Sequence, residues 1–474
     1  MKRNWLLWVL LILLLAATQT ASAATVYNVT TPAELKSVST TMLSGDDVII
    51  ELKNDLEIPA TVAPIQFKQG NIVINGNGNS ITFKNLTNDG LVMNDSNVEF
   101  NNVNFTNLSV STQNVINLIK LNRGNATFES CAFENNNHIS RVICLNGTNA
   151  EINNTSFNLS RGTLIRGENG GRVEFKNSSV VVIEGGQVYP ISFSKVDVLI
   201  ENVTVKDSYP AGWLFMFHDS VFNVTGITIE NTHFMRTSSF LVSNSTGIIQ
   251  NSYFGNNTLY EPQVNFIFER NSNVKIIQNT FFNSSLSKQF TATDSEVIFA
   301  FNTEYSDLSN GISENGNLIV RDSEYETYFG TNLPAQNGGY AKTIKLIDSE
   351  QNPAVEQITS EDYVAIMGSS PGDNRDATGS KRLRGERIDL GAVESTYGKS
   401  VIDKIIDDFF DDDDNENGET GTKPSLIRFL FGPDSIFNKV GSLLYHIMNG
   451  YVKADIPGIS EIHQNTIDLL GLQP

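Results

Sequence analysis

Three glutamates recur at one position of a repeated sequence pattern and could form a pair of reacting carboxylates. Glu99, Glu151 and Glu174 each precede an apolar residue and a polar bend, and Thr127 occupies the same position in the copy between. If the copies are neighbouring strands, Glu151 and Glu174 lie near 5 Å apart, which suits two carboxylates that share one glycosidic bond. Alternation along a strand also puts polar residues outward, so a plain surface position is the simpler interpretation.

Three aromatic residues, Tyr209, Trp213 and Tyr260, lie in or beside the longer links between copies of the pattern. Those longer links are residues 107–117, 206–213 and 256–264. Because the links leave the same joint of successive repeats, we expect them to crowd one flank, where repeat proteins often bind ligands. The rings could stack on sugars, or they could simply cover the core. The five histidines are scattered and indicate neither a metal site nor a catalytic triad.

These residues belong to a repeat of about 24 residues, in which an apolar residue, an Asn and a second apolar residue recur. The copy that defines this frame is Ile277, Asn279 and Phe282. Other copies are Phe100…Asn102…Phe105, Ile152…Asn154…Phe157, Phe175…Asn177…Val180, Ile200…Asn202…Val205 and Ile249…Asn251…Phe254, with degenerate ones ending at Val320…Asp322…Tyr325. A second apolar run, such as Phe266-Ile267-Phe268, precedes each frame. Short β-rich runs between Asn, Gly, Ser and Asp turns exclude amphipathic helices.

The pattern predicts an all-β fold, a right-handed parallel β-helix of about 11 or more coils within residues 24–398, with coils continuing to about Phe329. One coil cannot bury enough apolar surface alone, so the coils must stack and share ladder hydrogen bonds. We expect the recurrent Asn to occupy sharp bends and to form an internal ladder with the Asn of adjacent coils. Ligand binding by these Asn is the less favoured alternative.

The first residues predict a secretory signal, residues 1–23, because Lys2 and Arg3 precede an apolar run that ends at Ala21-Ser22-Ala23. An uncleaved anchor is the alternative. Residues 31–43 predict a capping helix, since Thr31-Pro32-Ala33-Glu34 combines a capping box with Pro at the first helical position. This helix would cover the open end of the stack.

Residues 370–395 carry a second signature, in which 376–394 read DATGSKRLRGERIDLGAVE. This run fits D-x-x-G-x-x-R-x-x-G-x-x-I-D-L-G-A-V-E and resembles the ending of secreted, pectate-lyase-like right-handed β-helix proteins of the archaeal adhesin-like type. The resemblance implies the β-helix architecture and an extracellular location, but no chemistry. We interpret Arg382, Asp389 and Glu394 as a buried or rim polar network that closes the last coil, in preference to a catalytic group.

The remaining residues predict an acidic linker, 399–424, and an amphipathic helical tail, 425–474. A calcium loop starting at Asp413 fails because its twelfth position is Pro424 instead of Glu. The tail lacks the length of a membrane span.

The whole chain has 474 residues and a net charge of −20, which argues against nucleic-acid binding. Cys131 and Cys144 are the two cysteines, and a disulfide and two buried thiols are equally compatible with the sequence. Asn-x-Ser/Thr motifs predict glycosylation in an exported protein. The candidate acceptors are Asn94, Asn104, Asn125, Asn146, Asn223, Asn244 and Asn283.

Together these patterns predict an exported adhesin-like protein, secreted or held at the cell surface or cell wall. It would bind cell-wall or host glycans, or other cell surfaces, through loops on one flank. We expect no cofactor, no nucleic-acid partner and no transmembrane span in the mature chain, and we assign no catalytic or metal-binding residue. The alternatives are a polysaccharide lyase or glycoside hydrolase on the same fold, and a structural spacer of the cell envelope.

Overall fold

The computed structural model describes residues 24–107, 116–135, 140–160, 162–182, 189–235, 238–259, 264–283, 286, 288–307, 312–339, 341–383 and 386–397. The expected signal segment, acidic linker and helical tail lie outside these residues. Within the described residues, no helix combines the length and apolarity that crossing a bilayer requires.

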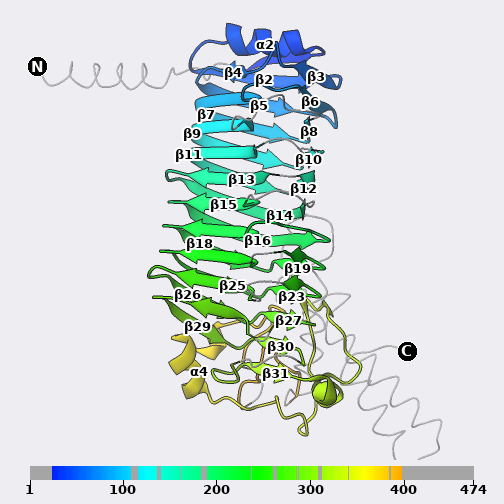
Figure 1. Cartoon of the computed structure of the whole chain (residues 1–474), viewed down its shortest axis with the longest axis vertical. Helices are drawn as coiled ribbons and strands as arrows, with labels where there is room; N and C mark the ends of the chain where they lie inside the picture. Colours follow the sequence, from blue (N-terminus) through cyan, green and yellow to red (C-terminus); the bar gives the residue numbers. More distant parts are fainter. Residues whose placement is uncertain are drawn as a thin grey trace, which may run out of the picture. The chain divides into compact units, whose positions relative to one another are not determined.

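The chain winds into a right-handed parallel β-helix, as the repeat predicts (Figure 1). One 29-stranded sheet wraps around the column, and every ladder within it is parallel; β9, for example, pairs with β11 from Asn117↔Arg141 to Glu129↔Asn153. The column has about ten turns, slightly fewer than expected. The reason is that the copy Val320…Asp322…Tyr325 forms the helices η1 and α3 instead of a further coil.

Each coil contributes to three faces. The first face contains β4 (Ile65–Phe67), β7 (Leu91–Asn101), β9 (Asn117–Glu129), β11 (Arg141–Asn153), β13 (Thr163–Glu168), β15 (Ile191–Ser194), β17 (Phe215–His218), β21 (Phe240–Ser243), β25 (Phe266–Glu269) and β28 (Phe290–Ala292). The strands β7, β9 and β11 continue into the second face. That face also contains β1 (Thr25–Val29), β2 (Asp46–Leu52), β5 (Gly70–Asn75), β14 (Arg172–Val182), β16 (Asp197–Lys206), β18 (Val221–Thr225), β22 (Thr246–Gln250), β26 (Asn273–Ile277) and β29 (Glu296–Ala300).

The ends of β14 and β16 continue into the third face. Its other strands are β3 (Leu56–Pro59), β6 (Ser80–Lys84), β8 (Asn104–Asn107), β10 (Ala132–Glu134), β12 (Ser156–Ser160), β19 (Thr228–Glu230), β23 (Tyr253–Gly255), β27 (Thr280–Phe282), β30 (Thr303–Tyr305) and β31 (Leu318–Val320). Two small pairs lie outside the main sheet: β20 (His233–Phe234) with β24 (Thr258–Leu259), and β32 (Ala335–Gln336) with β33 (Lys342–Thr343).

The interior is filled by residues that repeat at the same position in successive coils. Phe105, Phe133 and Phe157 stack with centroid separations of 5.0 and 4.9 Å. Parallel in-register pairing brings identical side chains one rung apart, so aromatic rings meet in the offset stacks that they favour.

The corner asparagines adopt the predicted left-handed conformation, with φ of 48° at Asn154, 47° at Asn177 and 52° at Asn202. Asn177 and Asn202 also form the predicted ladder contact, since Asn202 Nδ2 donates to Asn177 Oδ1 at 2.8 Å, whereas Asn177 Nδ2 donates to Asn153 instead of Asn154. The prediction of an internal ladder is wrong for these positions, because Asn154 and Asn177 are exposed. At a left-handed corner the Cα–Cβ bond points away from the column, which leaves the amides in solvent.

An internal asparagine ladder does exist, one residue further along the chain. Asn279, Asn302 and Asn317 are buried. The backbone N–H of Asn279 donates to Oδ1 of Asn302, and the backbone N–H of Asn302 donates to Oδ1 of Asn317, each at 2.9 Å. The defining copy Ile277…Asn279…Phe282 is therefore displaced by one residue: Ile249 pairs with Ile276, and Phe254 with Phe281.

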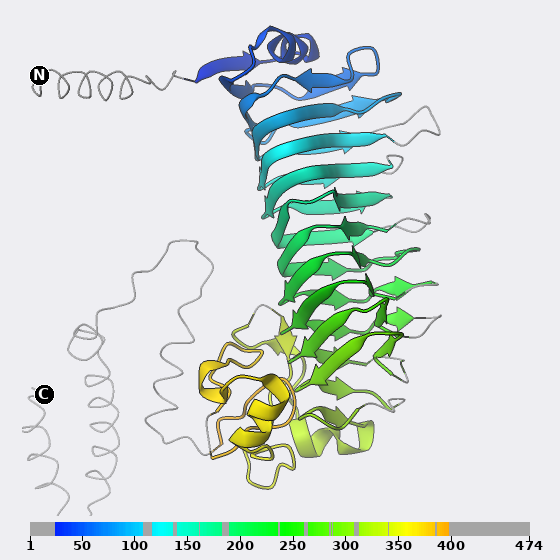
Figure 2. The same ribbon diagram turned by 90° about the vertical axis from the view of Figure 1, so that its left-hand side faces the viewer.

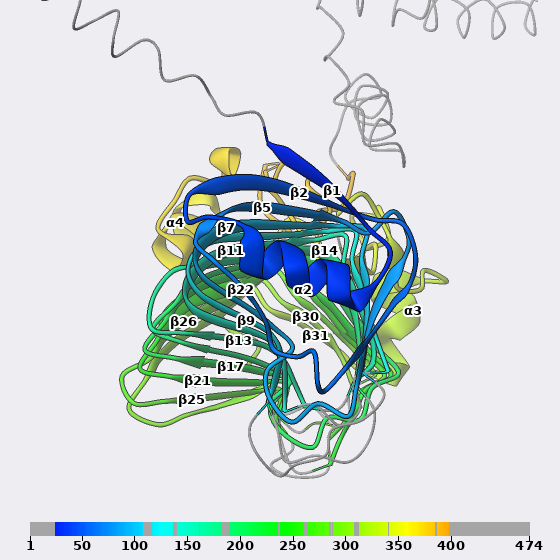
Figure 3. The same cartoon turned by 90° about the horizontal axis from the view of Figure 1, so that it is seen from above.

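Helices cover both ends of the column. At the first end lies α2 (Pro32–Thr41), which begins with the predicted capping box at Thr31 and crosses the coil below it (Figure 3). At the other end η1 (Asp322–Glu324) leads into α3 (Tyr325–Phe329), whose Phe329 packs on Leu318 and Val320. Covered ends remove the open strand edges that would otherwise template association.

The described residues of 330–397, which we call the C-terminal clamp, fold back along the lower coils. The clamp contains α4 (Ser360–Met367) and η2 (Pro371–Asp373), and Figure 2 shows its yellow ribbon beside the green strands. Lys342 Nζ reaches Glu230 Oε1 at 2.6 Å, and Gln278 Nε2 donates to the carbonyl of Arg375 at 2.8 Å. The repeat therefore ends under a cover made by the signature segment.

The signature residues form the buried network that the sequence predicts. Arg382 and Glu394 pair at 3.2 Å, and the guanidinium lies 4.7 Å from the ring centre of Phe301. Asp376 accepts the N–H of Glu394 at 2.9 Å, and Asp389 accepts that of Ser395 at 2.6 Å. Burial raises the pKa of Glu394 well above its usual value, and Arg382 opposes this rise. Because these side chains are buried, we interpret the network as one that stabilises the fold of the clamp, and we call it the lock.

Candidate functional site

The glutamate row has the register that the sequence predicts, because Glu99 pairs with Thr127, Thr127 with Glu151, and Glu151 with Glu174. Thr127, Glu151 and Glu174 line a shallow groove of about 390 Å³ on the second face, together with Arg172. The strands place these side chains there because outward positions alternate with buried ones such as Val173 and Phe175.

Cations neutralise two members of this row, Glu151 and Glu174. Lys176 Nζ lies 2.5 Å from Glu174 and 3.3 Å from Glu151, and Arg172 Nε lies 2.9 Å from Glu174. The hydrogen bond from Lys176 is the largest influence that lowers the pKa of Glu174. A glycosidase acid needs the opposite shift, towards a carboxyl that is protonated at neutral pH. The geometry therefore favours an ion-pair ladder over an acid–base pair.

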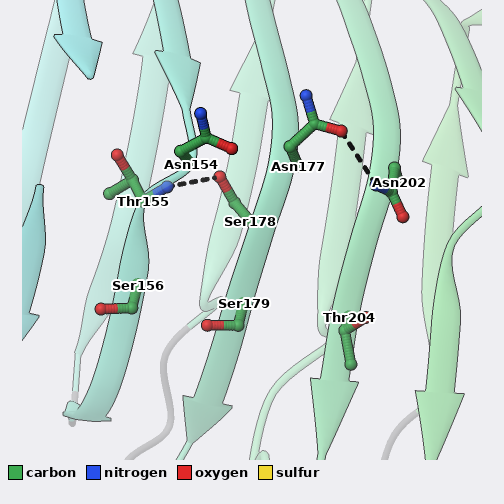
Figure 4. Close-up of a pocket in the computed structure, with 8 residues that line it drawn as sticks. All are labelled: Asn154, Thr155, Ser156, Asn177, Ser178, Ser179, Asn202 and Thr204. Carbon is green, nitrogen blue, oxygen red and sulfur yellow. Dashed lines mark hydrogen bonds between the residues drawn. The ribbon is translucent and has the colours of Figure 1, made fainter. Parts of the chain in front are cut away.

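A second hollow of about 280 Å³ runs along the corner between the second and third faces (Figure 4). Its lining consists of small uncharged residues, Asn154, Thr155, Ser156, Asn177, Ser178, Ser179, Asn202 and Thr204. Ser178 Oγ accepts the backbone N–H of Thr155 at 3.1 Å, and Asn177 accepts from Asn202. These hydrogen bonds connect neighbouring coils, so the polar groups of this hollow stabilise the stacking of the coils.

The aromatic flank is the more distinctive feature. Tyr209 stacks on His233 with ring centres 4.9 Å apart and an angle of 10°, and Trp213 stacks on Tyr189 at 5.4 Å and 21°. Tyr209 is 42% exposed and Tyr189 36%. Tyr260 lies outside the described residues. The structure brings the two predicted residues Tyr209 and Trp213 to the links that follow β16, and it adds Tyr189 and His233, which sequence reasoning missed.

Each of these ring pairs is built by the repeat. Tyr189 and Trp213 stand two residues before Ile191 and Phe215, which pair in the ladder between β15 and β17. The indole Nε1 of Trp213 is buried and has no hydrogen-bond partner within the described part of the chain. A flat, half-exposed ring pair is suited to a ligand that offers an apolar face.

A cluster of basic residues on the outward side of the first face was also missed. Lys120 lies 3.6 Å from Asp89, and Glu168 pairs with Arg166 at 2.7 Å and with Arg141 at 3.9 Å. Continuing the register along the second apolar run of each repeat reveals this cluster, because Lys120 pairs with Cys144 and Cys144 with Arg166.

The two cysteines are separate buried thiols. Burial raises the pKa of Cys131 to about 11 and also raises that of Cys144. Both are therefore protonated at neutral pH and act as small apolar residues.

The candidate glycosylation sites differ in how their side chains are used. Asn94, Asn125 and Asn146 belong to amide ladders, in which Asn122 donates to Asn94 at 2.7 Å and Asn146 donates to Asn122 at 3.1 Å. Asn244 donates to Asp219 and Asn283 to Asn256.

Two candidate acceptors stand outside such ladders. Asn104 is half-buried with an unpartnered carbonyl among the described residues, whereas Asn223 is exposed and accepts only from Thr225, at 3.0 Å. Glycan attachment at all seven positions stays a prediction. Among the described residues, no group of three or more His, Cys, Asp or Glu side chains is placed to hold a metal ion.

Comparison with known proteins finds no matching family model and no matching curated protein. Among solved structures, a mannuronic acid specific polysaccharide family 6 lyase from human gut microbiota is similar with 13% identity and a TM-score of 0.33, covering 62% of this chain and 91% of that one. The A-module of the Azotobacter vinelandii mannuronan C-5 epimerase AlgE4 is similar with 12% identity and a TM-score of 0.26, covering 61% and 90%. Likeness at this level carries no argument about activity or ligand.

Proposed function

We propose that this protein is an exported, adhesin-like column that binds glycans through its aromatic flank, at the cell surface or in the cell wall. The observation that carries the proposal is the pair of stacked, half-exposed ring systems at successive links, Tyr189–Trp213 and Tyr209–His233. Rings that merely covered the core would be buried, as the interior phenylalanines are.

The chemistry of the flank suits sugars. A sugar ring has an apolar face that packs on an aromatic ring and hydroxyls that hydrogen-bond at its edge. Prestacked rings lose little conformational freedom on binding, so more of the contact energy remains for affinity. The rigid ladder beneath them supplies this preorganisation.

Binding to a glycan array tests the proposal. We expect the wild type to retain a defined set of glycans, and Trp213→Ala and Tyr209→Ala each to weaken that binding by about tenfold or more, the loss typical of an aromatic anchor. Tyr209→Phe is the matched control, because it keeps the stacked ring and loses only the hydroxyl. Unchanged binding in both alanine variants would refute a role for the flank.

The same preparation separates the alternatives. Release of reducing ends or unsaturated sugars from the bound polysaccharides would identify a hydrolase or lyase and overturn the non-catalytic assignment. Absence of binding across the array, with a folded wild type, would favour the envelope spacer.

A further inference from the structure

One member of the basic cluster, Arg141, lies on the same stripe of the column as Tyr189 and Trp213. Lys120 and Arg166 flank this stripe, three residues further along their strands, where both pair with Cys144. Arg141 pairs with Thr163, which stands two residues before Ile165. Ile165 pairs with Ile191, and Ile191 with Phe215, so Tyr189 and Trp213 occupy the same position in the next two coils. Arg141, Thr163, Tyr189 and Trp213 are thus successive rungs, and the stripe spans about 14 Å at the usual strand spacing.

The cluster at one end of the stripe has an excess of positive charge. Lys120, Arg141 and Arg166 are opposed there by two carboxylates, Asp89 and Glu168. In a chain with a net charge of −20, a local positive surplus is the exception.

Partial burial keeps these charges effective. The side chains of Arg141 and Arg166 are 24% and 33% exposed, and Glu168 is 24% exposed. Charges that are partly withdrawn from solvent are screened less by salt than exposed ones. Arginine also offers a planar fork of donors, which matches the two oxygens of a carboxylate or the oxygens of a sulfate ester.

We infer that the stripe binds an anionic oligosaccharide, with an acidic group on Arg141, Lys120 and Arg166 and a sugar ring on Tyr189 and Trp213. The inference rests on the proposed function and names its ligand class. Thr163, which is buried, lies between the two ends and supports the middle of the stripe from below. Uronate and sulfate-ester glycans share the chemistry that this site recognises.

The test measures affinity by titration calorimetry for three oligosaccharides of equal length: a hexuronic acid oligomer, a sulfated dextran and neutral dextran. We expect the wild type to prefer an acidic oligomer, with affinity that falls as salt is raised. Arg141→Ala should weaken acidic binding by about tenfold or more, the loss typical of a hydrogen bond between charged groups, and should leave neutral binding unchanged. The uronate and sulfate arms show which acidic group the site takes.

Two further variants serve as controls for Arg141→Ala. Arg123→Ala removes the same charge from an exposed corner, where Arg123 pairs with Asp95, and should change little. Arg141→Lys keeps the charge without the fork and should give an intermediate loss. The melting temperature of each variant reports whether the column remains intact.

The outcomes separate this inference from the proposed function. Equal losses for Arg141→Ala and Arg123→Ala, or equal affinity for acidic and neutral oligomers in the wild type, would overturn the anionic ligand class. If Trp213→Ala still weakens binding in that case, glycan binding by the flank survives. If Trp213→Ala has no effect while Arg141→Ala does, the acidic site survives and the role of the rings is wrong.

Discussion

At the scale of single residues, the buried charges of the C-terminal clamp show what the signature segment does. Arg382 is fully buried, and its Nη2 donates to the carbonyl of Gly391 at 2.6 Å. Glu394 pairs with it, and the carboxylates of Asp376, Asp389 and Glu394 each accept backbone N–H groups. A buried charge is costly without partners, so the contacts of Arg382 with Glu394 and Gly391 favour this arrangement of the segment.

Removing the guanidinium should therefore be severe. We expect Arg382→Met to lower the free energy of unfolding by about 3–5 kcal/mol, because it leaves the buried Glu394 without its ion-pair partner and the carbonyls of Asp389 and Gly391 without their donor. Urea unfolding followed by circular dichroism measures this loss. A loss below that of a surface substitution such as Lys275→Ala would contradict the lock.

Glu394 makes a pH-dependent prediction. Because its pKa is raised in the folded state, its protonated form is the one that folding favours. This contribution is complete below the ordinary value of 4.5 and is lost as the pH rises through the raised value. Glu394→Gln imitates the protonated form, so we expect it to lose less stability than the wild type between pH 4.5 and neutrality. Equal loss in the two proteins would show that the pKa of Glu394 is not raised in the fold.

Residue patterns alone predicted only part of the candidate site. The sequence correctly predicts that Glu99, Glu151 and Glu174 align, because each stands one residue before the first apolar residue of the repeated frame. Lys120, Arg141 and Arg166 were missed because each stands in a different local context, and only the coil register makes them neighbours. Tyr189 was missed for the same reason: its partner Trp213 is a full coil away in sequence.

At the scale of the elements, two asparagine ladders have different energetic roles. The exposed ladder at Asn177 competes with water for its hydrogen bonds. The buried ladder at Asn302 satisfies the N–H of Asn279 and, through Nδ2, the carbonyl of Ile276 at 2.9 Å. Buried polar groups that lose a partner cost more than exposed ones.

Removal of the amide side chain distinguishes the ladders. Asn302→Ala should cost about 2–5 kcal/mol, because it leaves a buried donor and a buried acceptor unsatisfied. Asn177→Gly is the control, because glycine keeps the left-handed φ of 47° without strain, and it should cost about 1 kcal/mol or less, since water replaces the partner of the amide. Equal costs, measured from urea midpoints at a common slope, would contradict the assignment of inside and outside.

Sequence reasoning predicted these elements but misplaced their register by one residue at Ile277. Both Ile276 and Ile277 are buried: Ile276 faces the column interior and Ile277 packs on Tyr363 and Ile388 of the clamp. Because both residues are apolar, the sequence does not show which of them faces the interior. Ile277 is on the outward side of the strand, where the clamp buries it. A pattern in one segment of the chain cannot reveal that Tyr363 and Ile388, 86 and 111 residues further along, cover Ile277.

At the scale of the whole column, a single mechanism explains the architecture and the candidate site. Parallel in-register stacking turns a feature of one coil into a row, whether it is an aromatic core, an amide ladder or an ion-pair ladder. The helices α2 and α3 and the clamp end these rows, and the aromatic flank and basic cluster are rows left open to solvent.

A crystal structure of the column with a bound hexuronic acid oligomer tests this account most directly. We predict density for the sugar along Arg141, Thr163, Tyr189 and Trp213, with its acidic group at the arginine end. Sugar bound instead in the glutamate groove of the second face, or in the corner hollow lined by Asn154 and Asn177, would contradict the account.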